Sequence, residues 1–165
     1  MALVTSYLAI GSNLGNRLAN IKESLRYLKE INRIHIDKIS PIYESSPEGG
    51  PKNQPKYLNL ALKIKTALAP FDLLNELKII EKKLKRRNKI HWGPRTIDLD
   101  ILFYGDLILS SRALSLPHNL LHKRIFVLNP LVGIAPNFIH PVYNKSVKEL
   151  LRGLKNGNKK IVPFN

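Results

Sequence analysis

Two aspartates separated by a single residue, Asp98 and Asp100, are the clearest candidates for chemistry in this chain. Apolar and polar residues alternate over 96–104, which predicts a β-strand on which both aspartates leave the same face, about 6–7 Å apart at the backbone. Two like charges this close repel, whereas Mg²⁺ is typically held by one or two carboxylates together with substrate phosphates. Arg95, just before them, carries a planar group that matches phosphate oxygens. Together these residues predict a metal-dependent phosphate site.

Composition narrows the class of protein around that site. The 165 residues, 44% of them hydrophobic, suffice for one domain with a sizeable core, which we expect to span residues 1–165. Cysteine is absent, which removes disulfides and thiolate ligands and argues against zinc. No apolar run approaches a membrane span, and residues 1–5 lack the basic start of a signal peptide. We therefore expect a cytoplasmic protein that makes no membrane contact.

The chain is strongly basic, with 27 lysines and arginines against 12 aspartates and glutamates and a formal net charge of +15. Such an excess attracts polyanions, which include both nucleic acids and small phosphates such as ATP. Its densest group, residues 82–89, directly precedes the aspartate motif. The charge alone does not choose between these two classes of partner.

The first half of the chain predicts a strand, a helix and a second extended segment. Residues 4–10 read as a strand, and leucine and isoleucine at spacings of three and four over 18–28 indicate a helix. Residues 34–43 look extended, with a break at Pro41. A loop rich in proline and glycine follows over 44–55, and loops of that length tend to be functional or mobile.

The second half completes a β-α-β-β-α-β order. The pattern predicts a strand over 57–65, a helix opened by Pro70, a loop over 85–91, the aspartate-bearing strand, a tight reversal at Gly105 into a strand over 107–109, and a helix over 146–154. On the aspartate strand, one face should carry Ile97, Leu99, Ile101 and Phe103 and the other Asp98, Asp100, Leu102 and Tyr104. This order is typical of a ferredoxin-like α+β fold, with helices on one face of an antiparallel sheet, here followed by a C-terminal extension.

Several motifs in this chain resemble those of the 6-hydroxymethyl-7,8-dihydropterin pyrophosphokinases, folate-pathway enzymes that transfer diphosphate from ATP to a pterin alcohol. The motifs are AIGSNLG at 9–15, QPKYLN at 54–59, WGPRTIDLD at 92–100, Pro117-His118, Arg124 and FVLNPL at 126–131. The resemblance extends over nearly the whole chain, and the motif at 92–100 is the most specific of the set.

The resemblance implies that Asp98 and Asp100 bind two Mg²⁺ ions that bridge the phosphates of the co-substrate ATP. It assigns catalytic roles to Arg86, Arg95, Asp98 and Asp100, and ATP contacts to Leu74, Glu81, Arg86, Trp92, Arg95, His118 and Arg124. The second arginine of the family's catalytic loop falls at Asn88 here, where Arg87 or Lys89 could supply the charge. The family often has an aromatic residue in place of Asn119, so any stacking at that position is lost.

For the pterin, the resemblance implies a pocket between two aromatic rings, with buried hydrogen bonds that select the heterocycle. Tyr57 and Phe126 match the rings, and Asn59 matches the side chain that pairs with pterin nitrogens. The full set of implied pterin contacts is Ser45, Gly49, Tyr57, Asn59, Trp92 and Phe126. Ser46 and Glu48 replace a proline and an apolar residue that are common in the family, in a loop one residue longer.

Three other interpretations fit parts of the sequence. An RNA-binding module on the same sheet lacks the glycine- and phenylalanine-containing motif of RNA-recognition domains, and Asp98 and Asp100 would repel its ligand. A catalytically inactive relative is disfavoured by the retained aspartates, Arg95 and the two aromatic rings. A bifunctional folate enzyme would need a second active site, which these residues do not supply. We therefore expect a monomer that acts on ATP and a pterin alcohol and does not bind nucleic acid.

Overall fold

The computed structural model describes residues 2–84, 96–154 and 161–165. Its elements, in chain order, are β1 (Val4–Ser12), α1 (Arg17–Lys29), β2 (Ile34–Ile39), β3 (Tyr43–Ser45), β4 (Tyr57–Thr66), α2 (Pro70–Lys83), β5 (Asp98–Tyr104), β6 (Leu109–Ser110), β7 (Ser115–Leu116), the 3₁₀ turn Leu121–Lys123, α3 (Ile125–Val132), α4 (Val147–Gly153) and β8 (Ile161–Pro163). None of the described helices is long and apolar enough to cross a membrane.

The main sheet has the strand order β5-β1-β4-β3-β8, with β2 also paired to β4, and every pairing in it is antiparallel. β2 and β3 follow one another along the same side of β4, because the chain breaks at Pro41 between them. With β2 and β3 counted as one interrupted strand, this is the predicted ferredoxin-like order, which is confirmed.

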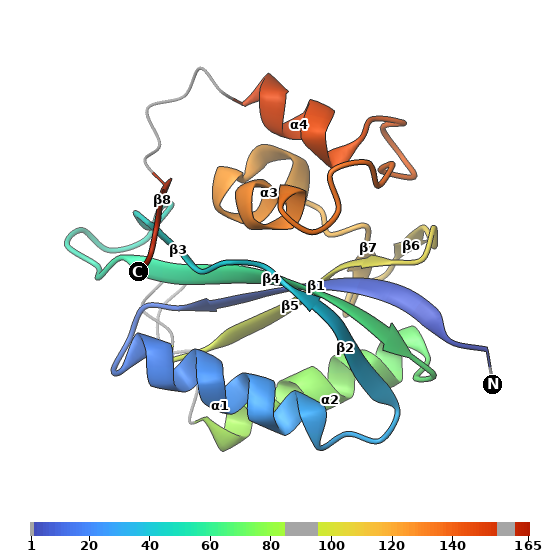
Figure 1. The fold of residues 1–165 in the computed structure, drawn as a ribbon, viewed down its shortest axis with the longest axis horizontal. Coiled ribbons are helices and arrows are strands. Elements are labelled where there is room, and N and C mark those ends of the chain that lie inside the picture. The colour runs from blue at the N-terminus through green and yellow to red at the C-terminus, as the bar shows by residue number, and fades with distance from the viewer. Residues whose placement is uncertain (1, 85–95, 155–160) are drawn as a thin grey trace.

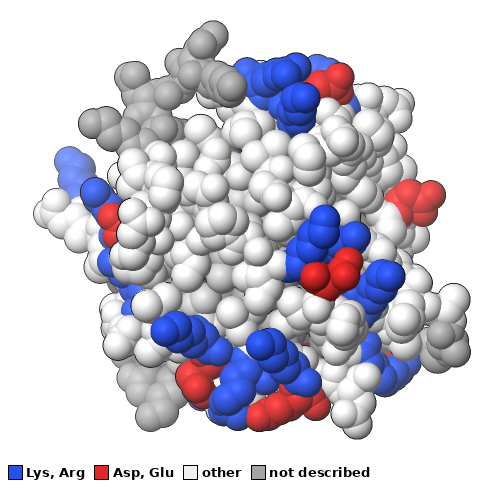
Figure 2. Space-filling view, in the orientation of Figure 1, with Lys and Arg blue, Asp and Glu red and all other residues white. Residues whose placement is uncertain are grey.

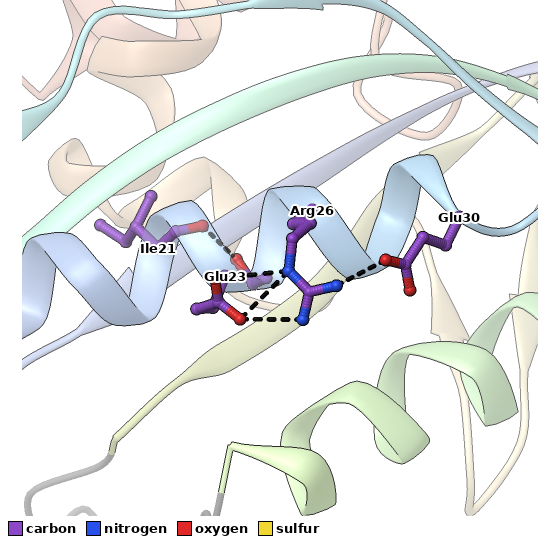
Figure 3. Close-up of polar contacts among 5 residues, drawn as sticks. Ile21, Glu23, Arg26 and Glu30 are labelled. Carbon is purple, nitrogen blue, oxygen red and sulfur yellow. Dashed lines mark hydrogen bonds and ion pairs between the residues drawn. The ribbon is translucent and has the colours of Figure 1, made fainter.

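Local signals set the starts of the helices. Asn16 caps α1 by accepting a hydrogen bond from the Ala19 amide, and Pro70 occupies the first turn of α2. On the exposed side of α1, the Arg26 guanidinium lies between the carboxylates of Glu23 and Glu30 (Figure 3). Because these side chains are about half exposed, solvent screens both pairs and they add little to the stability of the helix.

The sheet separates two apolar cores, one on each face (Figure 1). The α1 and α2 side buries the alternating leucines and isoleucines of β1 and β4, such as Leu8 and Leu60. On the other side, α3 and α4 pack over Tyr7 and Ala61. The expectation of helices on one face therefore holds for α1 and α2, while the C-terminal region covers the opposite face. β1 is buried on both faces because it lies between β5 and β4, with an apolar core on each side of the sheet.

The predicted alternation of faces along β5 is wrong beyond Ile101, because a β-bulge interrupts the strand. Tyr7 pairs with Phe103 but Leu8 pairs with Ile101, so Leu102 is an extra residue in the ladder. Beyond the bulge the alternation is inverted, and Phe103 joins Leu102 in the α3–α4 core instead of sharing the α1–α2 core with Ile101. Strict alternation assumes an uninterrupted ladder, and a bulge depends on the partner strand.

The predicted strand over 107–109 is also wrong in its bounds, because the strand after Gly105 is β6, Leu109–Ser110. The chain reverses at Gly105, whose φ of 52° suits glycine, but Leu109 then pairs with Leu116 in a separate two-stranded sheet. The connection between β6 and β7, residues 111–114, is a tight loop in which Ser111 exchanges hydrogen bonds with Leu114. This loop lies beyond the β5 edge of the main sheet, where it becomes one wall of a cavity.

Candidate active site

A cavity of about 470 Å³ lies across the ends of β1, β4 and β5, and its lining also includes Leu74 of α2. Its floor comes from these strands, and its walls come from the segment after β3, the β6–β7 loop, the turn before α3, and α3 itself. Nine of the predicted site residues lie in its lining: Ser45, Tyr57, Asn59, Leu74, Asp98, Asp100, His118, Arg124 and Phe126.

The strand register aligns the predicted pterin-binding and metal-binding residues on either side of β1. Gly11 of β1 pairs with Asn59 on one side and with Asp98 on the other, and Ala9 pairs with Asp100. Because residues at equivalent positions of neighbouring strands lie on the same face, the amide and the two carboxylates share one surface. The central strand contributes only small residues at these positions, which leaves space above the sheet.

Gly11 is needed for this close approach. A Cβ at this position would lie 3.3 Å from Asn59 Oδ1 and 3.4 Å from Tyr57 Cδ1. The strand backbone would tolerate any residue here, so the requirement comes from the neighbouring side chains. The AIGSNLG motif thus contributes space to the site as well as a turn.

We expect Gly11→Ala to weaken pterin binding about tenfold, because the packed Asn59 amide would have to shift by a few tenths of an ångström, at a cost of about 1–2 kcal/mol. Calorimetric titration of the pterin alcohol, with a non-hydrolysable ATP analogue present, measures the effect. Gly153→Ala is the matched control, because a Cβ there meets nothing within 4 Å. Equal pterin affinity in the two variants would contradict this account of Gly11.

The strand that carries the two aspartates, β5, is held by a hydrogen bond to a side chain of α2. Both carboxylate-bearing residues are half-buried and line the cavity. Between them, the Leu99 amide donates a hydrogen bond of 3.0 Å to the buried Glu81 carboxylate of α2. Glu81 therefore supports β5 from the opposite face, and it is not among the described residues that line the cavity.

His118 is fixed by backbone contacts on both sides. Its amide donates to the Leu102 carbonyl at 2.9 Å, and its ring Nδ1 accepts from the Leu120 amide at 3.2 Å. Burial, and to a lesser extent the Arg124 guanidinium, lower the pKa of His118 to about 4, against the opposing effect of Asp98. The neutral ring therefore carries its proton on Nε2, which makes that nitrogen a hydrogen-bond donor at neutral pH.

This shift predicts a loss of stability in acid. Because the folded-state pKa lies below the ordinary value of 6.5, protonation favours the unfolded chain. The stabilising contribution is complete above pH 6.5 and is lost as pH falls towards 4, by about 3 kcal/mol. Urea unfolding between pH 7 and 4 should show a shallower decline for His118→Gln than for the wild type. Substitution of the exposed His35 is the control, and parallel declines in His118→Gln and wild type would refute the prediction.

The pterin end of the predicted site is built on β3 and β4. Asn59 is buried, and its Nδ2 donates to Ser45 Oγ at 2.7 Å. This bond uses one amide hydrogen and orients the remaining donor and acceptor of the carboxamide. Tyr57 and Phe126, the two predicted stacking rings, both line the cavity.

Arg17 ties together both ends of the segment between β3 and β4. Its Nη1 donates to Glu44 Oε2 at 2.8 Å and to the Lys56 carbonyl at 3.0 Å. Its guanidinium also lies 5.9 Å from the ring centre of Phe164, next to β8. One cation at the start of α1 thus fixes the stems of a loop that forms part of the cavity wall.

Not every predicted site residue can be placed in this cavity. Arg86, Trp92 and Arg95, and the departure at Asn88, fall outside the described residues. Gly49 is exposed, its carbonyl accepts a hydrogen bond from Gln54, and it does not belong to the described cavity lining.

Sequence reasoning also missed part of the lining. Ser111, Arg112 and Ala113 of the β6–β7 loop were not predicted, and Glu48 and Val127 had been named only as a departure from the family pattern and as part of the FVLNPL motif. The Ser-Ser-Arg-Ala run at 110–113 signals a turn but gives no indication of what that turn faces.

A family model described as 7,8-dihydro-6-hydroxymethylpterin-pyrophosphokinase (HPPK) matches residues 7–136, which include every described residue of the predicted site. The chain belongs to this family. Two HPPK relatives of similar length are the 2-amino-4-hydroxy-6-hydroxymethyldihydropteridine pyrophosphokinases of Aquifex aeolicus and Haemophilus influenzae. The first is 44% identical over 89% of this chain and 90% of its own length, and the second 40% identical over 84% and 86%.

Other HPPK relatives are longer. The bifunctional protein FolKE of Lactococcus lactis MG1363 is 41% identical over 95% of this chain, which spans 44% of that relative. Among solved structures, an HPPK-DHPS in complex with substrates superimposes with a TM-score of 0.75 over 93% of this chain, at 16% identity. HPPK-DHPS of Plasmodium falciparum gives 0.72 over 92%, at 18% identity. The chain covers 43% of each of these structures, and at such low identity they support the HPPK fold alone.

Proposed function

We propose that this chain transfers diphosphate from ATP to the hydroxymethyl group of 6-hydroxymethyl-7,8-dihydropterin, giving AMP and the pterin diphosphate, in tetrahydrofolate biosynthesis. Membership of the HPPK family supports the reaction class. The observation that carries the proposal is the strand register at Gly11, which places Asn59 and Asp98 on one face at two ends of a single cavity. A heterocycle at one end and a phosphate chain at the other can thus meet.

The residues present fit two Mg²⁺ ions held by Asp98 and Asp100. Both are hard carboxylate oxygen donors on the same face of β5, as Mg²⁺ prefers. Among the described residues there is no cluster of three or more histidine, aspartate or glutamate side chains suited to a metal. Water and phosphate oxygens would therefore complete the coordination, which is usual for Mg²⁺ with nucleotides. Bound there, the ions supply neutralisation of charge on the triphosphate.

The proposed step is an in-line attack of the hydroxymethyl oxygen on the β-phosphorus of ATP. A bond forms from that oxygen to the β-phosphorus, the bond to the oxygen bridging to the α-phosphorus breaks, and AMP leaves while the alcohol proton passes to solvent. His118 Nε2 and the Arg124 guanidinium would donate to phosphate oxygens from the cavity wall. Positioning and electrostatics dominate such transfers, so no covalent enzyme intermediate is needed.

Roles for the remaining predicted residues follow from the family resemblance. Arg86 and Arg95 would add positive charge around the transferred diphosphate, and Trp92 would close over both substrates. Leu74 would contact the nucleotide from α2, where it lines the cavity, whereas the Glu81 carboxylate is engaged by the Leu99 amide and would act through β5.

On the pterin side, Tyr57 and Phe126 would stack on the ring and Asn59 would pair with its nitrogens. Ser45 orients Asn59 through the hydrogen bond between their side chains. Gly49, on the exposed loop, would offer only backbone contacts. Burying a flat heterocycle between aromatic faces supplies affinity, while the buried amide supplies specificity.

We further propose a cytoplasmic monomer whose residues 1–165 form one domain and which does not bind nucleic acid. Along the edge of the molecule over α1, basic side chains are interspersed with acidic ones (Figure 2), as in the Glu23–Arg26–Glu30 group. Such mixing is unlike the basic stripe expected of a nucleic-acid platform. The carboxylates of Asp98 and Asp100 on the α3 side also oppose a polyanion.

Release of AMP from ATP, dependent on both Mg²⁺ and the pterin alcohol, tests this function directly. The expected result is stoichiometric AMP and pterin diphosphate, with neither product formed when one component is omitted. Tight binding of both substrates without AMP release would instead support a catalytically inactive relative. Binding of single-stranded RNA in preference to ATP would support the RNA-binding alternative.

A further inference from the structure

Glu48 places a carboxylate against a cation of the proposed nucleotide site. Its Oε2 lies 3.9 Å from Nε of Arg124, and both residues line the cavity. Their side chains are only 24% and 23% exposed, so water screens the pair incompletely. Glu48 belongs to the segment after β3, whereas Arg124 precedes the first turn of α3, so the contact bridges two walls of the cavity.

Arg124 has limited room for a second anion. Its guanidinium also lies 5.5 Å from the ring centre of Phe126, so one face of the planar group is directed at an aromatic ring. A nucleotide triphosphate that used Arg124 would approach a site already facing a carboxylate. The phosphate oxygens would then have to displace Glu48 from Arg124 or accept its repulsion, and either costs binding free energy.

We propose that Glu48 acts as an internal competitor for Arg124 and thereby sets the affinity of the cavity for nucleotide phosphates. Without nucleotide, the carboxylate neutralises Arg124 and holds the segment after β3 against the start of α3. When phosphates bind, they take the place of the carboxylate. The inference rests on the proposed function, since it takes a nucleotide as the anion. Within that site, Glu48 is a residue that weakens nucleotide binding, in contrast to the residues proposed to promote it.

The test is a double-mutant cycle on equilibrium binding of α,β-methylene-ATP with Mg²⁺. This analogue cannot be cleaved at the bond that AMP release requires, so binding is measured without turnover. Removing one incompletely screened charge should make Glu48→Gln bind the analogue about three- to tenfold more tightly than the wild type. In an Arg124→Ala background the same substitution should give a clearly smaller gain in affinity, because there is no longer an Arg124 guanidinium for which carboxylate and phosphate compete.

Glu30→Gln is the matched control. It removes the same charge from an exposed site on α1, across the sheet from the cavity, and should leave the affinity unchanged. An unchanged or weaker affinity in Glu48→Gln, an equal gain in the Arg124→Ala background, or an equal gain in Glu30→Gln would each overturn the proposal. If wild type binds the analogue but releases no AMP from ATP, the proposed function fails while the cycle still decides the role of Glu48. If wild type does not bind the analogue, both fail.

Discussion

Replacing Asp98 or Asp100 with alanine is expected to lower kcat for AMP release at least about 10³-fold, with nucleotide affinity changed about tenfold or less. Each carboxylate would hold a metal ion whose main effect is on charge that develops during transfer, so its loss falls on turnover. Steady-state AMP release at saturating substrates gives kcat, and calorimetry with α,β-methylene-ATP gives affinity.

Two further variants separate charge from shape. Asp98→Asn keeps the size of the side chain but removes its charge, and it should lose turnover nearly as severely. Asp106→Ala removes an exposed carboxylate just beyond the same strand and should retain wild-type turnover. If Asp98→Ala kept most of its activity, the assignment of these carboxylates as metal ligands would be wrong.

Asn59→Ala should weaken pterin binding about 100-fold or more, the second large effect. The Asn59 amide is buried. Without it, the hydrogen bonds to the pterin are lost, and the polar groups of the bound pterin are left buried without partners. The measurement is the dissociation constant of the pterin alcohol with α,β-methylene-ATP and Mg²⁺ present. Affinity for the analogue in the absence of pterin should stay within about threefold of the wild type.

Ser45→Ala is the informative comparison for Asn59. It removes the hydroxyl that orients the amide but leaves the amide itself and the backbone of β3 in place. We therefore expect a smaller loss, about three- to tenfold in pterin affinity, since a single hydrogen bond contributes about 1 kcal/mol. Equal losses in the two variants would mean that Asn59 acts only by holding β3.

The strand and helix order was predictable because each element carries its own local signal. Alternation over 57–65, Pro70 at the start of α2 and Ser146 at the start of α4 depend only on nearby residues. Such signals fail where an element depends on a distant partner. The bulge at Leu102 is set by pairing with β1, and the strand after Gly105 pairs with β7 instead of returning along β5.

The candidate site was predictable in its chemistry but not in its full outline. Residue spacing led to Asp98 and family motifs led to Asn59 and His118, which the fold gathers in one cavity from three separate segments. Their catalytic and binding roles stay predictions. Glu48 was recognised only as a departure from the family pattern, and its contact with Arg124 lies between residues far apart in the chain.

The sequence by itself determined which side chains this protein has available for chemistry and the order of elements that carries them, because spacing and local propensity act over a few residues. Tertiary structure alone decided that α3 and α4 cover the second face of the sheet, that Gly11 leaves room between Asn59 and Asp98, and that Arg17 joins both stems of a loop. Each of these depends on contacts between distant segments, which only the packed chain brings within reach of one another.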